Sequence, residues 1–211
     1  MSSAEQHNPE WLSTAVFNDS FDWSKSITTT FQIFFEFVTL HDSRWETITL
    51  NPTNETILLI ELDAFWNKKY TLKFHENDTW PYLIFKIPNV INISYNTVDF
   101  ATTIVESSCI TIDATQIEEL VGLLSETTVF PKELASRLIK LNEVHKTRFD
   151  DAYGGNIEIL HSPEILVLLI DRDGTYIDPT LDKAGPSDIK RNPIKAEEKG
   201  FLKKLWNKLI Q

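Results

Sequence analysis

The chain has 211 residues, of which 42% are hydrophobic, so it is long and apolar enough to bury the core of one large domain. A formal charge of −11 at pH 7 argues against general nucleic-acid binding, which needs a cationic surface, and favours a basic partner. Since Cys109 is the only cysteine in the sequence, neither an intrachain disulfide nor a cysteine-based zinc site is possible.

Hydropathy along the chain predicts its compartment. Residues 1–25 lack the basic and apolar regions of a secretory signal. No stretch approaches the roughly 18–20 consecutive apolar residues that a membrane-spanning helix needs. We therefore expect a cytoplasmic protein.

The first predicted element is a short helix over residues 9–17. Pro9 suits the first helical position, and Asn8 before it suits the N-cap. Helical spacing places four apolar side chains on one face, which we expect to pack on the core: Trp11, Leu12, Ala15 and Val16.

Residues 27–40 predict one long strand. Successive side chains of a strand point to opposite faces, and the predicted core face is formed by Phe31, Ile33, Phe35 and Phe37. A turn at residues 41–43 leads to a return strand at residues 45–50.

The centre of the chain, residues 56–95, predicts an antiparallel β-meander. Residues 57–60 and 82–87 are nearly continuous in β-branched and aromatic side chains, as expected of strands buried on both faces. Residues 70–74 alternate between apolar and polar side chains, which is typical of a half-buried strand. Pro88 and Asn89 then break the pattern before a further strand.

After a strand at residues 104–112 the pattern becomes helical. Asp113 and Gln116 form a capping-box pattern at the start of one helix. A second helix is predicted from Pro131, with a buried stripe of Leu134, Leu138, Leu141 and His145. Strands at residues 157–160 and 165–171 follow, and a short return strand closes a C-terminal β-hairpin. This order indicates an α+β fold: an antiparallel sheet, two central helices and the hairpin.

The strand at residues 165–171 runs into the motif Asp171-Arg172-Asp173-Gly174-Thr175. An apolar strand followed by DxDGT resembles the first motif of the haloacid-dehalogenase-type phosphatases. The resemblance implies that Asp171 takes the phosphoryl group, that Asp173 protonates the leaving group, and that Mg²⁺ neutralises charge around the phosphate. In that family a doubly wound sheet follows the motif and supplies a lysine and an acidic metal pair, whereas here only residues 176–211 follow. The alternative, which we favour, is a tight hairpin turn that uses Asp and Gly for their backbone freedom.

The last part of the chain differs from the rest in charge. Residues 181–196 contain two Pro-centred breaks and predict a linker after a single domain at residues 1–180. Residues 197–211 predict a basic amphipathic helix that contacts an anionic membrane, a partner's groove or the acidic body of its own chain. The predicted binding residues of this helix are Phe201, Leu202, Lys203, Lys204, Leu205, Trp206, Lys208 and Leu209.

The sequence contains no phosphate-binding glycine loop, no catalytic serine motif and no histidine pair at metal-ligand spacing, so we expect neither a cofactor nor a metal. Small, acidic, cysteine-poor α+β proteins resemble the immunity or antitoxin class, which neutralises a basic toxin by occluding it. The resemblance implies non-catalytic binding of a basic protein partner. Two alternatives are a membrane-associated adapter that docks through the C-terminal helix and a phosphatase that uses Asp171 and Asp173.

Overall fold

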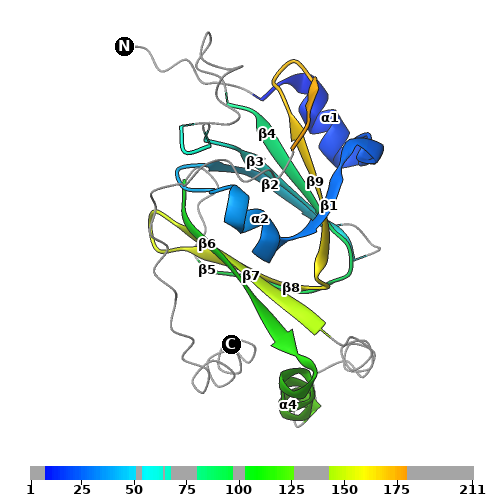
Figure 1. The fold of residues 1–211 in the computed structure, drawn as a ribbon, viewed down its shortest axis with the longest axis vertical. Helices are drawn as coiled ribbons and strands as arrows, with labels where there is room; N and C mark the ends of the chain where they lie inside the picture. Colours follow the sequence, from blue (N-terminus) through cyan, green and yellow to red (C-terminus); the bar gives the residue numbers. More distant parts are fainter. Residues whose placement is uncertain are drawn as a thin grey trace. The chain divides into compact units, whose positions relative to one another are not determined.

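The computed structural model describes residues 8–50, 54–63, 65–67, 80–96, 103–125 and 143–179 (Figure 1). The chain divides into two compact units. The first consists of Met1–Ile110 and His145–Asp182, and it contains most of the described strands. The second consists of Thr111–Val144 and Lys183–Gln211.

Two antiparallel sheets contain the described strands. The order in the first sheet is β1 (Ile27–Thr30), β9 (Glu164–Ile170), β4 (Tyr82–Ile87), β3 (Thr56–Glu61) and β2 (Arg44–Leu50), and β10 (Tyr176–Ile177) also pairs with β9. The order in the second sheet is β5 (Val90–Asn96), β8 (Asn156–His161), β7 (Glu143–Asp151) and β6 (Ile104–Asp113). Strands predominate and a few helices accompany them, which confirms the α+β class and the C-terminal hairpin of β9 and β10.

The central strands of the first sheet are buried on both faces. Every residue of β3 is buried, and β4 is buried except at Lys86, which is half-buried. Their nearly continuous apolar sequence predicted this burial. β2, β3 and β4 are consecutive antiparallel neighbours and form a meander, whereas the predicted strand at residues 70–74 lies outside the described residues.

Two adjoining corners carry the chain between the sheets. Asn89 has a φ of 56° and turns the chain from β4 into β5 of the second sheet. Ser162 lies at the corner that returns the chain from β8 to β9 of the first sheet. Its hydroxyl donates to the carbonyl oxygen of Pro88 at 3.0 Å, and its N–H donates to that of Asn89 at 3.4 Å. The single meander predicted over residues 56–95 is therefore wrong beyond Pro88, because β5 belongs to the second sheet and pairs with β8.

The single strand predicted over residues 27–40 is wrong beyond Thr30, because residues Phe31–Phe37 form the helix α2. The Thr30 side chain accepts a hydrogen bond from the N–H of Ile33 at 3.2 Å and so caps the helix. Phe31, Phe34 and Phe35 are buried, whereas Ile33 is 47% exposed. Because so many positions in this segment are apolar, it satisfies helical spacing as well as strand alternation.

The rings of α2 join the two sheets into one core. The centroid of Phe31 lies 4.9 Å from that of Phe85 in β4 and 5.8 Å from that of Phe149 in β7. Phe34 also meets Phe85, at 5.1 Å, and Phe35 meets Phe149, at 6.1 Å. Each such ring pair adds about 0.5–1.5 kcal/mol to the stability of the fold, in addition to the stabilisation that comes from burying its apolar surface. The position of α2 between the sheets is visible in Figure 1.

The helix α1 (Glu10–Asn18) covers the other face of the first sheet (Figure 1). Leu12 and Val16 are buried there, with Trp11 and Ala15 packed beside them, so the predicted face is confirmed. The predicted cap is wrong. Pro9 occupies the N-cap position, while the Asn8 side chain accepts a hydrogen bond from the Tyr82 hydroxyl and donates to Glu46.

In the second unit the helix α4 (Ala114–Ser125) begins with the predicted capping box. The N–H of Gln116 donates to Asp113 Oδ1 at 2.9 Å, and the N–H of Asp113 donates to Gln116 Oε1 at 3.0 Å. The predicted helices from Pro131 and over residues 197–211 lie outside the described residues. None of the helices within the described ranges has the length and hydropathy to cross a membrane.

The prediction that His145 lies on the buried stripe of a helix is wrong. His145 belongs to the strand β7 and lies opposite His161 of β8. It is 1% exposed, so its burial was predicted correctly and its element was not. The sequence Glu143–Asp151 alternates along a strand that faces the shared core, and this period of two overrides the helical spacing of the preceding leucines.

Two truncations on α2 distinguish the helix from the strand that alternation predicts. Phe34→Ala removes a buried ring and should lower the free energy of unfolding by about 3–5 kcal/mol. Ile33→Ala, at the neighbouring exposed position, should cost less than about 1 kcal/mol. Chemical denaturation measures both. A strand would place Ile33 in the core with Phe31 and Phe35, so a larger loss for Ile33→Ala would refute the helix.

Candidate functional site

The DxDGT motif forms the tight turn between β9 and β10. The N–H of Asp171 donates to the carbonyl oxygen of Thr175 at 2.8 Å, and that of Gly174 donates to the carbonyl oxygen of Asp171 at 3.0 Å. Gly174 has a φ of 88°, a conformation that side chains disfavour. Tyr176 then pairs with Ile170 across the hairpin. The tight-turn alternative thus describes the backbone of this segment.

Both aspartates of the motif accept hydrogen bonds within the turn. Asp171 Oδ1 accepts from the N–H of Arg172 at 2.7 Å, and Asp173 Oδ1 accepts from the N–H of Thr175 at 2.8 Å. The hydrogen bond from the Thr175 backbone lowers the pKa of Asp173. Among the residues that the structure describes, no group of three His, Cys, Asp or Glu side chains is arranged to hold a metal ion. The local geometry accounts for the motif by turn formation.

The residue between the two aspartates extends into a buried ionic cluster. Arg172 pairs with Glu61 of β3, and its guanidinium lies 5.0 Å from the ring centroid of Tyr82. Glu61 also pairs with Arg44 of β2 at 3.5 Å, and it is 3% exposed. The Trp11 indole donates to the carbonyl oxygen of Arg172 at 3.1 Å. This cluster fastens the hairpin turn to the end of the sheet.

Sequence reasoning did not identify the Glu61 cluster. The available signal was an acidic residue directly after the apolar run at residues 57–60. A carboxylate in such a position requires a cationic partner, because an unpaired buried charge is costly. Burial has a second effect here, since it raises the pKa of the neighbouring Tyr82 to about 12.

A line of polar side chains crosses the second sheet on its core side. Cys109 Sγ of β6 lies 3.6 Å from His145 Nδ1 of β7. Thr147 Oγ1 lies 2.9 Å from His161 Nε2, and His161 Nδ1 lies 2.5 Å from the carbonyl oxygen of Ser162. A carbonyl oxygen only accepts, so Nδ1 of His161 carries the proton and Nε2 accepts from the Thr147 hydroxyl. Cys109 packs against the core, in the strand where the sequence placed it.

Every lysine and arginine among the described residues is already paired with a carboxylate. The pairs are Lys25–Asp22, Arg44–Glu61, Lys86–Asp19, Lys146–Glu158, Arg148–Asp150 and Arg172–Glu61. The described cations therefore neutralise carboxylates of their own chain and do not form a basic surface.

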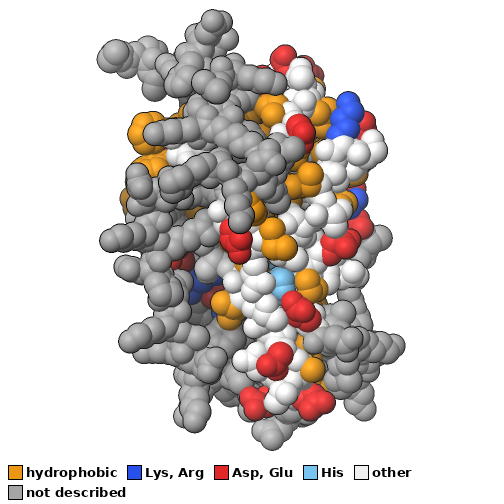
Figure 2. All heavy atoms as spheres, in the orientation of Figure 1, with side chains coloured by type: hydrophobic (Ala, Val, Ile, Leu, Met, Phe, Trp, Pro, Cys, Tyr) orange, Lys and Arg blue, Asp and Glu red, His pale blue; other side chains and the backbone are white. Residues whose placement is uncertain are grey.

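Other carboxylates are exposed and form no ion pair. In the described part of the first unit they include Glu10 on α1, Glu36 on α2, Glu106 on β6, Glu164 on β9 and Asp178 after β10. Figure 2 shows Asp and Glu side chains spread over the face drawn, with few Lys or Arg among them. The described surface therefore keeps an excess of negative charge, because each described cation already lies beside a carboxylate and these exposed carboxylates have no such partner.

The predicted binding residues Phe201, Leu202, Lys203, Lys204, Leu205, Trp206, Lys208 and Leu209 lie outside the described residues. The acidic surface and the DxDGT turn are therefore the described candidates for function. Comparison of the chain with protein-family models, with curated proteins and with solved structures finds no match.

The buried His161 of the second sheet makes the free energy of unfolding depend on pH. Burial lowers the pKa of His161 from 6.5 to about 4, so in this range the unfolded chain takes up a proton that the folded chain does not. Stability should fall by about 3 kcal/mol as the pH falls from 6.5 to 4. Denaturation of the wild type and of His161→Gln at several pH values measures this loss. An equally steep loss in both proteins would assign it to other groups.

Proposed function

We propose that this protein is a non-catalytic binding protein that associates with a basic protein partner through its acidic surface. One observation carries the proposal: each described lysine and arginine is engaged in an internal ion pair, while several exposed carboxylates are not. A partner with clustered lysines and arginines would meet a complementary potential, which accelerates encounter and disfavours acidic competitors.

The mode of action that fits this surface is occlusion, as in the immunity and antitoxin class. Such inhibitors need a stable scaffold and fast association rather than a reactive group. The scaffold is present in the two sheets and their shared aromatic core. The proposed compartment is the cytoplasm, where the Cys109 thiol remains reduced.

The phosphatase alternative is weakened by the turn geometry. Asp171 and Asp173 each accept a backbone hydrogen bond inside the turn, so their carboxylates serve the hairpin. Hydrolysis of a phosphoester by the Mg²⁺-supplemented protein, abolished by Asp171→Asn, would overturn the non-catalytic assignment.

Association with the partner should depend strongly on salt and on the exposed carboxylates. Once a partner has been isolated from the native host, its association rate constant should fall at least about tenfold between low and physiological salt. Combined replacement of Glu10, Glu36 and Glu164 by Lys should lower the rate at low salt by a similar factor. Stopped-flow fluorescence measures both effects.

The matched control for this charge reversal is the triple Gln variant, which removes the charges without inverting them. It should lie between the wild type and the Lys variant at low salt, and all three should converge at high salt, where exposed charges are screened. An acidic partner, or a rate that does not change with salt, would refute the proposal.

The membrane-adapter alternative rests on the amphipathic pattern at residues 197–211 and is tested by deleting residues 196–211. Each large apolar side chain contributes about 1.5–3 kcal/mol when fully buried. If the stripe is buried within the folded chain, as we expect, deletion should lower the melting temperature by several degrees, which calorimetry measures. An unchanged melting temperature, with loss of binding to anionic liposomes, would instead favour the adapter.

A further inference from the structure

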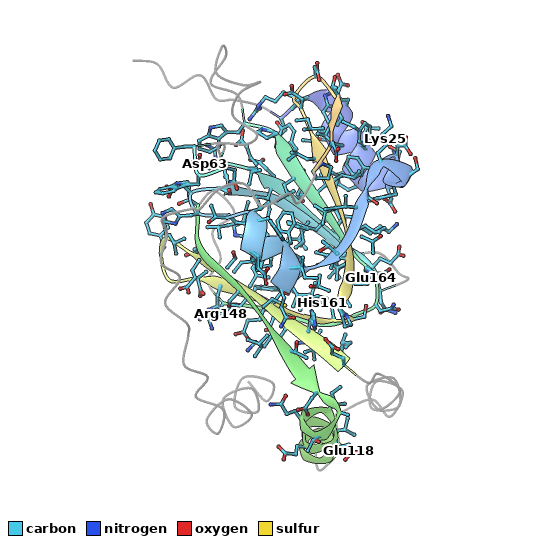
Figure 3. The ribbon with its side chains drawn as sticks, in the orientation of Figure 1. Lys25, Asp63, Glu118, Arg148, His161 and Glu164 are labelled. Atoms are coloured by element: carbon cyan, nitrogen blue, oxygen red, sulfur yellow. The ribbon has the colours of Figure 1, made fainter. Side chains whose placement is uncertain are left out.

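Exposed aromatic rings meet carboxylates just beyond the paired ends of β2 and β3. We call this the aromatic–acidic corner and define it as His41, Asp42, Asp63, Phe65 and Trp66. Figure 3 labels Asp63 on the left of the view, where ring-bearing side chains project from the ribbon. Phe65 is 66% exposed and Trp66 is 37% exposed, so both rings offer surface to a ligand.

The rings of the corner stand nearly perpendicular to one another. The centroids of Phe65 and Trp66 are 5.2 Å apart with an interplanar angle of 88°, and those of His41 and Trp66 are 4.9 Å apart at 74°. The Trp66 indole N–H donates to Asp42 Oδ2 at 2.9 Å, which fixes the ring's direction. At these distances the rings are in edge-to-face contact and form two adjoining walls of fixed orientation, and a cation can bind over a ring face that stays exposed.

Hydrogen bonds from buried groups hold these walls in place. The N–H of Phe65 donates to Asp63 Oδ1 at 2.6 Å, and the N–H of Asp63 donates to the Ser43 hydroxyl at 3.0 Å. Asn67, which is buried, donates its side-chain amide to the carbonyl oxygens of Thr39 and Asp63. The rings therefore stand on a platform that is formed before any ligand binds, which reduces the entropy lost on binding.

The corner carries uncompensated negative charge. The Asp42 side chain is 45% exposed and lies 3.6 Å from the His41 ring. Asp63 is 5% exposed, and its burial, followed by the effect of nearby Asp42, raises its pKa. Among the described residues no lysine or arginine pairs with either carboxylate. A cation from outside would therefore gain two attractive charges.

We propose that the aromatic–acidic corner binds an arginine side chain of the basic partner, an inference that rests on the proposed function. A planar guanidinium stacks on an aromatic face and donates to a carboxylate in the same pose, whereas an ammonium cannot stack. An apolar partner would bury Asp42 without a counter-charge, and a second copy of this chain would bring the same negative charges. Trp and Arg are also the residues most enriched at the energetic centre of interfaces.

The direct test uses a short arginine peptide, acetyl-Gly-Arg-Gly-amide, added to the full chain. The Nε1–H resonance of Trp66, assigned by its loss in Trp66→Phe, should shift and saturate. The lysine peptide should bind more weakly, and the citrulline peptide, which has nearly the shape of arginine but no charge, should cause no saturable shift. Equal shifts from the arginine and citrulline peptides would overturn the proposal, because they would show that the charge is not recognised.

Single substitutions distinguish the contribution of the aromatic rings to peptide binding from that of the carboxylate charge. Asp42→Asn should weaken the arginine peptide about tenfold, by loss of a charge-assisted hydrogen bond. Phe65→Ala should weaken it about two- to fivefold, by loss of a cation–π contact. Phe17→Ala, which truncates an aromatic ring on α1 that is 86% exposed, is the matched control and should change nothing. Unchanged melting temperatures identify variants that fold normally.

The same variants distinguish failure of the corner from failure of the proposed function. If the isolated basic partner still binds with a salt-dependent rate and equal affinity to Asp42→Asn and Phe65→Ala, the function stands and the corner is refuted. If the arginine peptide binds as expected but the isolated partner is acidic, the corner stands as a cation site and the proposed function is refuted.

Discussion

The contact of Phe31 with Phe85 on one side and Phe149 on the other is the interaction on which the fold depends. β4 belongs to the first sheet and β7 to the second, so a single ring connects the inner faces of both. The Thr30 cap and the pairing of β1 with β9 fix where α2 begins, and this directs its buried rings toward both sheets. Because the core lies between sheets and helix, none of the three layers can bury its apolar face alone.

Local patterns predicted those elements whose signal is contained in a few neighbouring residues. The strands β3 and β4, the Asp113 cap of α4 and the hairpin at Gly174 all belong to this group. The helix α2 was missed because its phenylalanines satisfy two periods at once, and only the position of Phe85 and Phe149 decides between them. The sequence also could not predict which sheet β5 and β8 join, since the corner formed by Pro88 and Ser162 depends on a hydrogen bond between distant segments.

In the candidate site, too, features set by neighbouring residues could be predicted, whereas features set by contacts between distant segments could not. The turn chemistry of the DxDGT motif could be predicted from Asp and Gly alone, and the total charge predicted an acidic surface. Neither the neutralisation of every described cation nor the aromatic–acidic corner could be predicted, because four of the six ion pairs and the contact of Asp42 with Trp66 join residues from separate strands or loops. Asp42 meets Trp66 only because the antiparallel pairing of β2 with β3 brings the start of one strand to the end of the other.

The place of β9 in the first sheet has a consequence for synthesis on the ribosome. β9 lies between β1 and β4, and Ile27 pairs with Val167, near the end of the described chain. Until residues 164–170 leave the exit tunnel, β1 and the apolar β4 each lack the neighbour that β9 supplies. Unpaired strand edges are templates for misassembly, and pairing between distant segments is slow. The nascent chain therefore completes its central sheet only after β9 has emerged, and holding chaperones have their longest opportunity to act before that point.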